Sequence, residues 1–377
     1  MGAQVARHPE TGLLAVEPLG ELTEYQACTR IPEVRRALGN DVLILGHHYQ
    51  RDEVIRFADR TGDSLELARE AARNGDAKAI VFCGVHFMAE TAVILSAPDR
   101  AVILPDATAG CSMADMAEPD QVALAWEELA DALTGSVGDP AAEVMPVAYV
   151  NSTAAVKAFV GERGGSICTS ANAAAVFDWA LSLGPRLFFL PDQHLGRNTA
   201  VLRGIPASET LVWDPAKPFG GNTAEAVRSA RIYLWQGHCQ VHTRFRVEQI
   251  EAYRKAVPDV RILVHPECPL EVVQAADHVG STGYIIRTIR EAPAGSKWAV
   301  GTEIHLVERL RTAHPDKTIA SLLPGISLCS TMNRIDPQHL LHALERISAG
   351  EPVGKVSVPE TVAHKARLAL DRMLSIS

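Results

Sequence analysis

The 377-residue sequence lacks the features of a membrane, secreted or nucleic-acid-binding protein. Its longest apolar runs, at residues 42–45, 79–83 and 187–190, are far shorter than the roughly 20 residues that a membrane-spanning helix needs. The first seven residues carry no apolar signal-peptide core. Lys and Arg (36) are outnumbered by Asp and Glu (45), and the net charge of -9 argues against nucleic acid or an anionic membrane as a partner. We therefore expect a cytoplasmic protein.

Local cysteine pairs and nucleotide-binding motifs are also absent. Seven cysteines occur, an odd number, at the widely spaced positions 28, 83, 111, 168, 239, 268 and 329. This distribution argues against a disulfide framework, and without a CxxC pair it excludes a zinc ribbon and the usual local iron–sulfur motif. Neither GxGxxG nor GxxxxGK[ST] occurs, so a nucleotide site has no support. Any metal cluster must be assembled from residues far apart in the sequence.

What the sequence does contain is an alternation of short β-branched runs and longer helical stretches. This pattern is typical of parallel sheets covered by helices and predicts an α/β fold. The runs fall into three successive groups, which indicate an internal repeat of three small α/β units without strong residue-by-residue similarity. We expect an N-terminal extension, three α/β domains and a C-terminal segment, with boundaries at 1–24, 25–118, 119–212, 213–345 and 346–377.

Polar residues gather where the predicted strands end. Ligands of open parallel sheets bind beyond the carboxyl ends of the strands, where helix N-termini favour anions. Three domains that each present such an edge could close around one central site.

Three of the seven cysteines, separated by 128 and 90 residues, are candidates for metal ligands. If the repeat is real, each repeat would supply roughly one thiolate to the centre from Cys111, Cys239 and Cys329. Thiolates are the usual ligands of iron–sulfur clusters, and three of them would leave one iron open to act as a Lewis acid. Spacing alone favours the alternative that all seven cysteines are small, buried apolar residues.

Two pairs of polar residues follow predicted strands, one of the form His-x-Tyr and one of the form His-x-Glu. His47 and Tyr49 are two residues apart, as are His265 and Glu267, so in an extended segment each pair points to one side. Both pairs suit proton transfer, and the second also suits metal ligation. The alternatives are a solvated loop for the first pair and an N-cap before a helix at 270–276 for the second. His242, three residues after Cys239, shares a face with it if that stretch is a helical turn.

Small polar turns at 169–172 and 280–283 combine hydroxyl groups with small residues at strand-to-helix junctions. Such turns can hold a phosphate or a carboxylate. Plain helix capping is the favoured alternative for either turn alone.

Taken together, the motifs between residues 41 and 336 resemble the quinolinate synthase family. No single motif is decisive, but their order is very specific. They are HHYQ (47–50), GDSL (62–65), FCGVHFMAET (82–91), AGCSMA (109–114), YVN (149–151), CTSANA (168–173), PDQHLG (191–196), WQGHCQVH (235–242), HPECP (265–269), GST (280–282), GTE (301–303) and CSTM (329–332).

This resemblance implies three pseudo-symmetric three-layer αβα domains with parallel sheets around a central active site. It implies a 4Fe–4S cluster with three cysteine ligands, Cys111, Cys239 and Cys329, and one open iron. The implied reaction condenses iminoaspartate with dihydroxyacetone phosphate to quinolinate, releasing phosphate and water, in de novo NAD biosynthesis. The implied partners are these two small anionic substrates and, as a further candidate, the enzyme that makes iminoaspartate.

The resemblance also assigns roles to individual residues. It implies five catalytic residues: His47, Tyr49, Tyr149, His265 and Glu267. It implies seven substrate-binding residues: Ser64, Met88, Asn151, Ser170, His242, Ser281 and Thr282. Cys83, Cys168 and Cys268 lie inside motifs but are expected not to be ligands.

Three rival functions remain open at this point. They are another iron–sulfur hydro-lyase with an open iron, a non-enzymatic iron–sulfur sensor or carrier, and a zinc hydrolase that uses His and Glu ligands. The sensor would not need the paired His, Glu and Tyr residues, and usually carries a basic DNA-binding surface that the sequence lacks.

Overall fold

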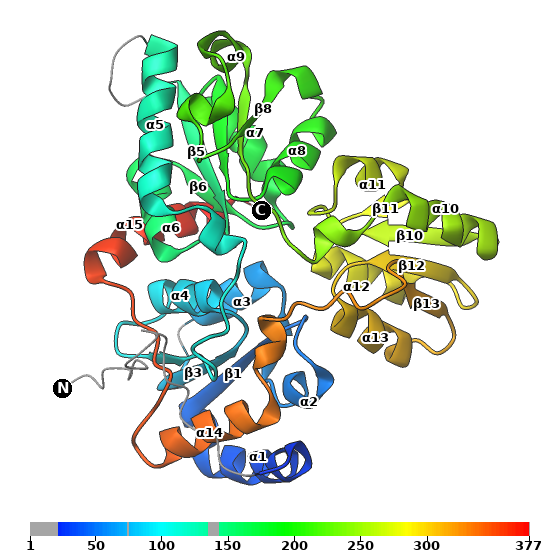
Figure 1. Ribbon diagram of the computed structural model, residues 1–377. Helices are drawn as coiled ribbons and strands as arrows, with labels where there is room; N and C mark the ends of the chain where they lie inside the picture. The colour runs from blue at the N-terminus through cyan, green and yellow to red at the C-terminus, as the bar shows by residue number, and fades with distance from the viewer. Residues whose placement is uncertain (1–21, 74, 135–142, 377) are drawn as a thin grey trace, which may run out of the picture.

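Three parallel β-sheets, each covered by helices, organise the computed structural model (Figure 1). The structure describes residues 22–73, 75–134 and 143–376. The extension predicted at 1–24 lies almost entirely outside these residues. The α/β class and the three parallel sheets expected from the sequence pattern are confirmed. None of the helices in the described part of the chain is long and apolar enough to span a membrane.

The first sheet has the strand order β2-β1-β3-β4. Its β1 and β3 strands are almost completely buried, as expected for strands with helices on both faces. Helices α3 and α4 cover one face, and α1 and α14 cover the other (Figure 1). The elements are α1 (Glu24–Leu38), β1 (Val42–His47), α2 (Asp52–Ile55), β2 (Arg60–Gly62), α3 (Ser64–Ala72), β3 (Ala79–Cys83), α4 (His86–Leu95), β4 (Ala101–Ile103) and α14 (Pro337–Ser348).

The second sheet has five strands in the order β6-β5-β7-β9-β8. Helices α5 and α6 lie on one side, and α7 and α8 lie on the other (Figure 1). The elements are α5 (Pro119–Thr134), β5 (Val144–Tyr149), α6 (Ala154–Glu162), β6 (Ser166–Cys168), α7 (Ala173–Leu183), β7 (Arg186–Leu190), α8 (Gln193–Leu202), β8 (Thr210–Trp213), α9 (Ala224–Ser229), β9 (Ile232–Trp235) and α15 (Glu360–Ser375).

This second sheet continues past residue 212, where the sequence pattern placed the start of the third domain. Strand β9 is fully buried and pairs with both β7 and β8, with Tyr233 opposite Phe188 and Leu211. We therefore propose that the second domain extends to Trp235.

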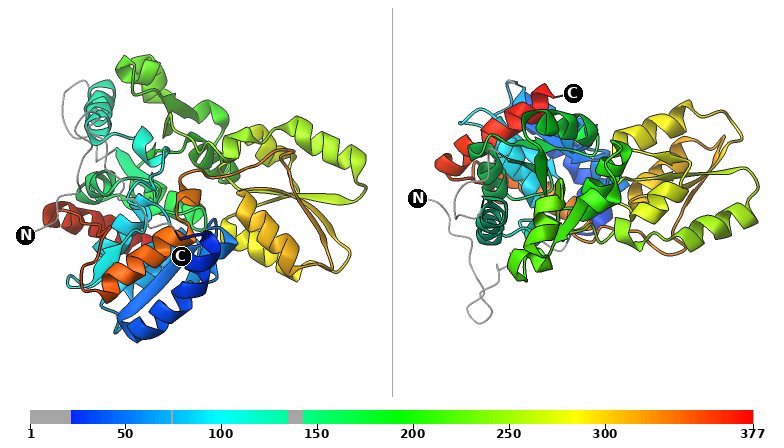
Figure 2. Two further views of the ribbon diagram at one scale, coloured as in Figure 1. Left: turned by 60° about the horizontal axis from the view of Figure 1, so that its bottom comes forward. Right: turned by 90° about the horizontal axis from the view of Figure 1, so that it is seen from above.

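The third sheet has the strand order β11-β10-β12-β13 and two separate apolar cores, one on each face. Along β10, Ile262 and Val264 pack toward α10 and α11, while Leu263 packs toward α12 and α13. The views in Figure 2 show this domain set apart from the other two. The elements are α10 (Val247–Ala256), β10 (Val260–Val264), α11 (Leu270–Ala275), β11 (His278–Val279), α12 (Thr282–Glu291), β12 (Lys297–Gly301), α13 (Ile304–Ala313) and β13 (Thr318–Ser321).

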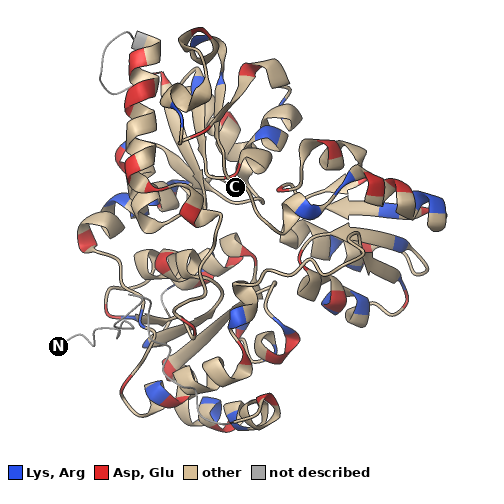
Figure 3. Cartoon of the chain, in the orientation of Figure 1, with Lys and Arg blue, Asp and Glu red and all other residues tan. Residues whose placement is uncertain are grey.

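After the third sheet the chain returns to the first two domains. Helix α14 packs against α1, and α15 packs against α6 and β6. Buried residues of both returning helices, such as Leu340 and Leu370, belong to the core that the first two sheets share. Acidic and basic residues are interspersed over the outer helices of all three domains, although α5 carries acidic residues only (Figure 3).

Candidate active site

One cavity, which is open to solvent, lies where the three domains meet. Every site residue expected from the sequence lines it except Ser281. The lining residues are His47, Tyr49, Asp63, Ser64, Val85, Phe87, Met88, Cys111, Met113, Tyr149, Asn151, Thr169, Ser170, Cys239, Val241, His242, His265, Glu267, Thr282, Cys329, Thr331 and Met332. The predicted convergence of distant motifs on one site is therefore present in the structure.

The three cavity cysteines begin three similar turns. The carbonyl oxygen of Cys111 accepts a hydrogen bond from the Asp115 N–H (3.1 Å). The Cys239 carbonyl accepts from the Thr243 N–H (3.1 Å), and the Cys329 carbonyl accepts from the Asn333 N–H (3.0 Å). Each cysteine is followed three residues later by a short 3-10 helix, at Ala114–Met116, His242–Arg244 and Met332–Arg334. The pseudo-symmetry thus reaches the local geometry of the cysteines, although their motifs differ in sequence.

These turns suit bound thiolates better than free thiols. Burial raises the pKa of Cys111 to about 12 and the pKa of Cys239 well above its ordinary value. Backbone N–H groups nevertheless point at the sulfur atoms, those of Met113 and Ala114 at Cys111 and that of His242 at Cys239. A bound metal displaces the thiol proton, and the N–H groups then stabilise the sulfur anion. Three such sulfurs in one cavity are a donor set that fits an iron–sulfur cluster.

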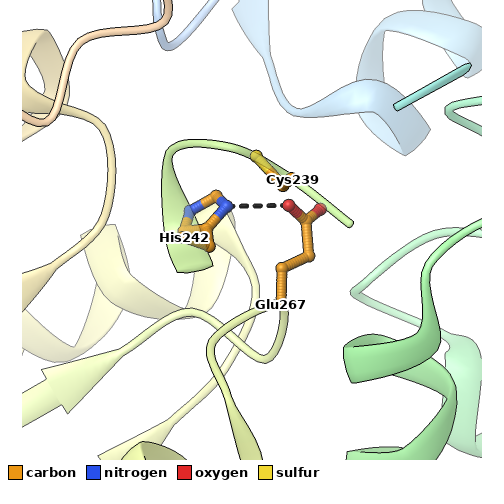
Figure 4. A group of neighbouring side chains, drawn as sticks. All are labelled: Cys239, His242 and Glu267. Atoms are coloured by element: carbon orange, nitrogen blue, oxygen red, sulfur yellow. Dashed lines mark hydrogen bonds and ion pairs between the residues drawn. The ribbon is translucent and has the colours of Figure 1, made fainter. Parts of the chain in front are cut away.

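A second potential metal-binding group overlaps this set. Donor atoms of Cys239, His242 and Glu267 lie within 4.8 Å of one another (Figure 4). The His242 Nδ1 atom and the Glu267 Oε2 atom are, however, already hydrogen-bonded at 2.7 Å. Both atoms would have to give up this bond to coordinate one ion.

Glu267 is the centre of a buried network of hydrogen bonds. The Tyr149 hydroxyl donates to Glu267 Oε1 (2.6 Å), and His242 holds Oε2. The rings of His242 and His265 stack with centroids 4.4 Å apart. Burial alone would raise the pKa of Glu267, but the nearby His242 and His265 and the hydrogen bonds from His242 and Tyr149 outweigh it and hold this pKa below its usual range. Burial and the neighbouring His242 lower the pKa of His265 to about 3, so this ring is uncharged at neutral pH.

Tyr49 is linked to this network through Thr302. The Thr302 hydroxyl lies 2.9 Å from the Tyr49 hydroxyl and 3.3 Å from His242 Nε2. Thr282 donates a further hydrogen bond to the Tyr49 hydroxyl (3.2 Å). A continuous chain of polar groups therefore joins Tyr49, through Thr302, His242 and Glu267, to Tyr149. Such a chain can move protons between two sides of a bound ligand.

His47 occupies the neighbouring position as an uncharged ring. Its Nδ1 atom accepts a hydrogen bond from the Tyr49 N–H (3.1 Å), and the two rings meet edge to face. Burial, reinforced by His48, lowers the pKa of His47 to about 3. A neutral imidazole beside a tyrosine hydroxyl suits proton transfer, and the alternative of a solvated loop does not fit the burial of His47.

The cavity lining also includes hydroxyl and amide groups with spare hydrogen-bonding capacity. The Asn151 Oδ1 atom is buried and makes no hydrogen bond with any described residue. Ser64 begins α3, and Ser170 lies in the turn before α7. Buried polar atoms are normally satisfied, so the lone Asn151 oxygen is suited to a ligand.

The structure differs from the expectations in detail. Ser281 is the N-cap of α12, where its hydroxyl accepts from the Tyr284 N–H (3.3 Å), so plain capping applies to this residue. Glu267 does not cap α11, which has Pro269 at its N-cap. Sequence reasoning gave no site role to Asp63 or Thr302. The GDSL and GTE motifs contain both, and their position at strand ends is the signal that could have identified them.

Cys83, Cys168 and Cys268 are fully buried and do not line the cavity. Burial raises the pKa of Cys83 to about 12. The thiol of Cys268, which is next to Glu267, donates a hydrogen bond to the Gly301 carbonyl oxygen (3.8 Å).

Comparison with known proteins agrees with this geometry. The family model described as quinolinate synthetase A protein matches residues 29–375. Proteins named quinolinate synthase are similar along nearly their whole length. The chain is 56% identical over 349 residues to one from Herpetosiphon aurantiacus, covering 92% of each chain. It is 54% identical to one from Corynebacterium glutamicum (94% and 90% covered) and 49% identical to one from Rhodopirellula baltica (98% and 97% covered). The chain belongs to the quinolinate synthetase A family.

Proposed function

We propose that this protein condenses iminoaspartate with dihydroxyacetone phosphate to form quinolinate, releasing phosphate and two waters, as a step of NAD biosynthesis. The observation that carries the proposal is the meeting of Cys111, Cys239 and Cys329 at one cavity with the Glu267 network. The three sulfurs would hold a 4Fe–4S cluster, which supplies a Lewis acid when bound. All seven cysteines are free, which is typical of a reducing compartment, and we place the activity in the cytoplasm.

The protein's own residues would then hold the substrates and move protons. Each dehydration needs one group to accept a carbon-bound proton and another to assist the departing hydroxide. Glu267, ionised and held by Tyr149 and His242, is placed to accept a proton, and the Tyr149 hydroxyl is placed to return one. Tyr49 with His47 would assist the ketose–aldose isomerisation of the triose, and the neutral His265 would serve as a second base.

Polar groups on the walls would hold the anionic parts of the substrates. Asn151, Ser170, Ser64 and Thr282 would offer hydroxyl and amide groups to carboxylates or phosphate. Ser281 would contribute by capping α12 and thereby placing Thr282. Met88 would form part of the apolar wall.

The test is metal and product analysis of anaerobically reconstituted protein. We expect the wild type to bind about four irons and four sulfides and to form quinolinate from the two substrates. Cys111→Ser, Cys239→Ser and Cys329→Ser should each lose the cluster absorption and Mössbauer signals. Cys28→Ser is the matched control, because Cys28 is a half-buried thiol on α1 that does not line the cavity.

Other outcomes point to the rival functions. Zinc in place of iron and sulfide would favour a hydrolase built on Cys239, His242 and Glu267. An intact cluster without quinolinate formation would favour a different hydro-lyase or a sensor. Either result would overturn the proposal.

A further inference from the structure

The turn of residues 169–172 forms one wall of the cavity and is organised by a single amide. Thr169 and Ser170 line the cavity. The Asn172 Oδ1 atom accepts hydrogen bonds from the Thr169 N–H (2.8 Å) and the Thr169 hydroxyl (3.2 Å). Thr169 Oγ1 in turn accepts from the Ala171 N–H (3.2 Å). The path of the backbone in this wall therefore depends on the position of the Asn172 side chain.

The other end of the same amide reaches the end of α15. The Asn172 Nδ2 atom donates to the carbonyl oxygens of Met373 (3.2 Å) and Ile376 (3.0 Å). The side chain is only 6% exposed, and its two N–H groups and its oxygen are all engaged. An aspartate would place a carboxylate oxygen against two carbonyls and could not donate to them. The position thus requires an amide and not merely a polar residue of this size.

Helix α15 is held rigidly enough to act as an anchor. A Cβ atom on Gly161 of α6 would lie 2.0 Å from the Lys365 carbonyl oxygen, so the two helices touch through their backbones. Arg372 donates to the Gly165 carbonyl (2.5 Å), and Ala369, Leu370 and Met373 are completely buried. The two carbonyls that hold Asn172 therefore have fixed positions relative to β6.

We propose that Asn172 is a positioning residue that couples the docking of α15 to the 169–172 turn, and that α15 thereby sets the affinity of the cavity for its anionic ligand. The coupling follows from the path of hydrogen bonds that runs from α15 through the Asn172 amide to Thr169, which lines the cavity beside Ser170. The identity of the anionic ligand, a dicarboxylate such as quinolinate, rests on the proposed function. Asn172 itself does not line the cavity, so it acts through Thr169 and Ser170.

The experiment compares Asn172→Asp and Asn172→Ala with Asn222→Asp. Asn222 is a matched control because its Nδ2 atom also donates to backbone carbonyls, those of Val212, Phe219 and Gly220, but in a turn that does not line the cavity. Asn172→Ala removes the amide without adding a charge, and it also serves if the aspartate variant fails to fold.

Two measurements are made on each variant. In cluster-loaded enzyme, both Asn172 substitutions should weaken the binding of quinolinate about fivefold or more, which is the effect of losing one hydrogen-bonded constraint. They should also raise KM, while kcat stays within about twofold of the wild-type value. In cluster-free protein, hydrogen exchange should become faster in residues 166–176 and 370–376 together. Asn222→Asp should change neither region nor the affinity.

The outcomes separate this inference from the proposed function. If the wild type forms no quinolinate, the proposed function fails, while the exchange experiment still decides whether α15 and the turn are coupled. If exchange and affinity in the Asn172 variants match the control, or if only residues 166–176 respond, the positioning role is wrong.

Discussion

At the scale of single residues, Glu267 makes the sharpest prediction. Glu267→Gln keeps the size of the side chain but removes the negatively charged carboxylate that Tyr149 and His242 hold. We expect kcat to fall by about 100-fold or more, because a positioned acid–base group contributes that much. Iron content and cluster absorption should stay at wild-type values. Steady-state kinetics and iron analysis measure the two effects.

Glu271→Gln is the control for this change, since Glu271 is exposed on α11, four residues away. It should retain full activity. Normal turnover in Glu267→Gln would remove Glu267 from the mechanism, and loss of iron would show that the residue supports the metal site instead.

Lys157 makes a prediction about pH and stability. Its ammonium group is completely buried, donates to the Ser152 carbonyl and lies 5.5 Å from the centre of the Phe87 ring. Burial lowers the pKa of Lys157 from 10.5 to about 8, despite the opposing effect of Glu90 and Cys111. Below pH 8 the side chain is charged in both the folded and unfolded states, and the folded state loses about 3 kcal/mol by burying the charge.

Lys157→Met removes this penalty. In cluster-free protein at pH 7 the variant should be more stable than the wild type in urea unfolding. The difference should narrow between about pH 8 and pH 10.5, because there the folded wild type has released its proton while the unfolded chain has not. Lys255→Met, at an exposed position on α10, should show no such pH dependence. A constant difference across this range would contradict the prediction.

The residues that the sequence singled out for the site differ in a physical way from those it passed over. Tyr149 and Glu267 carry side chains whose chemistry marks them as candidates wherever they follow a strand. Thr302 has an ordinary hydroxyl, and only its contacts with Tyr49 and His242 connect it to the candidate site. The hydroxyl of Ser281, which is also a predicted substrate-binding residue, caps the first turn of α12.

At the scale of elements, periodicity predicted most strands because buried parallel strands are continuous apolar runs. Strand β9 shows this property, but its place in the second sheet depends on pairing with β7 across more than 40 residues of chain, which no local pattern records. The similar turns after Cys111, Cys239 and Cys329 were also hidden, because backbone hydrogen bonds define them and their side chains differ.

The loop that carries Cys239 depends on the absence of a side chain at Gly237. A Cβ atom there would lie 2.3 Å from the Pro191 carbonyl oxygen, and the Gly237 carbonyl accepts from the Gln193 N–H (2.9 Å). Gly237→Ala must therefore move the loop two residues before Cys239. We expect a loss of about 1–3 kcal/mol in the free energy of unfolding, the usual effect of overpacking, together with less iron per chain after reconstitution.

Gly325→Ala is the control for this substitution. A Cβ atom at Gly325 would meet no heavy atom within 4 Å, so the stability and iron content of the Gly325→Ala variant should match those of the wild type. If Gly237→Ala behaved like this control, the close approach to Pro191 would have no bearing on the metal site.

At the scale of the whole molecule, the repeat of three α/β units could be predicted, but the route of the last helices could not. Helices α14 and α15 are amphipathic, which indicates that each packs against another part of the protein. The sequence of the helix does not identify which part that is. Their partners α1 and α6 are encoded by surface shape, as at Gly161, and not by a sequence motif. The contacts that hold the third domain against the first likewise follow from surface shape and not from a sequence motif.

Arg309 is a clamp between these two domains. It lies on α13 of the third domain and donates to Asp52 (2.7 Å), to the His48 carbonyl (2.8 Å) and to the Gln50 carbonyl (2.5 Å) in the first domain. The segment that Arg309 binds directly follows His47 and contains Tyr49. The clamp therefore fixes His47 and Tyr49 relative to Thr282 and Thr302 of the third domain.

Arg309→Met should leave each domain folded but loosen the cavity. We expect kcat/KM to fall about tenfold, the effect of losing part of three hydrogen bonds worth about 1 kcal/mol each. Hydrogen exchange should become faster in residues 47–55, while iron content stays unchanged because the three groups that Arg309 binds lie outside the cysteine turns. Arg311→Met is matched in helix and chemistry, since Arg311 pairs only with Glu308 of its own helix among the described residues. Equal kinetics in the two variants would show that the proposed reaction tolerates free movement of the third domain, and that the clamp serves stability alone.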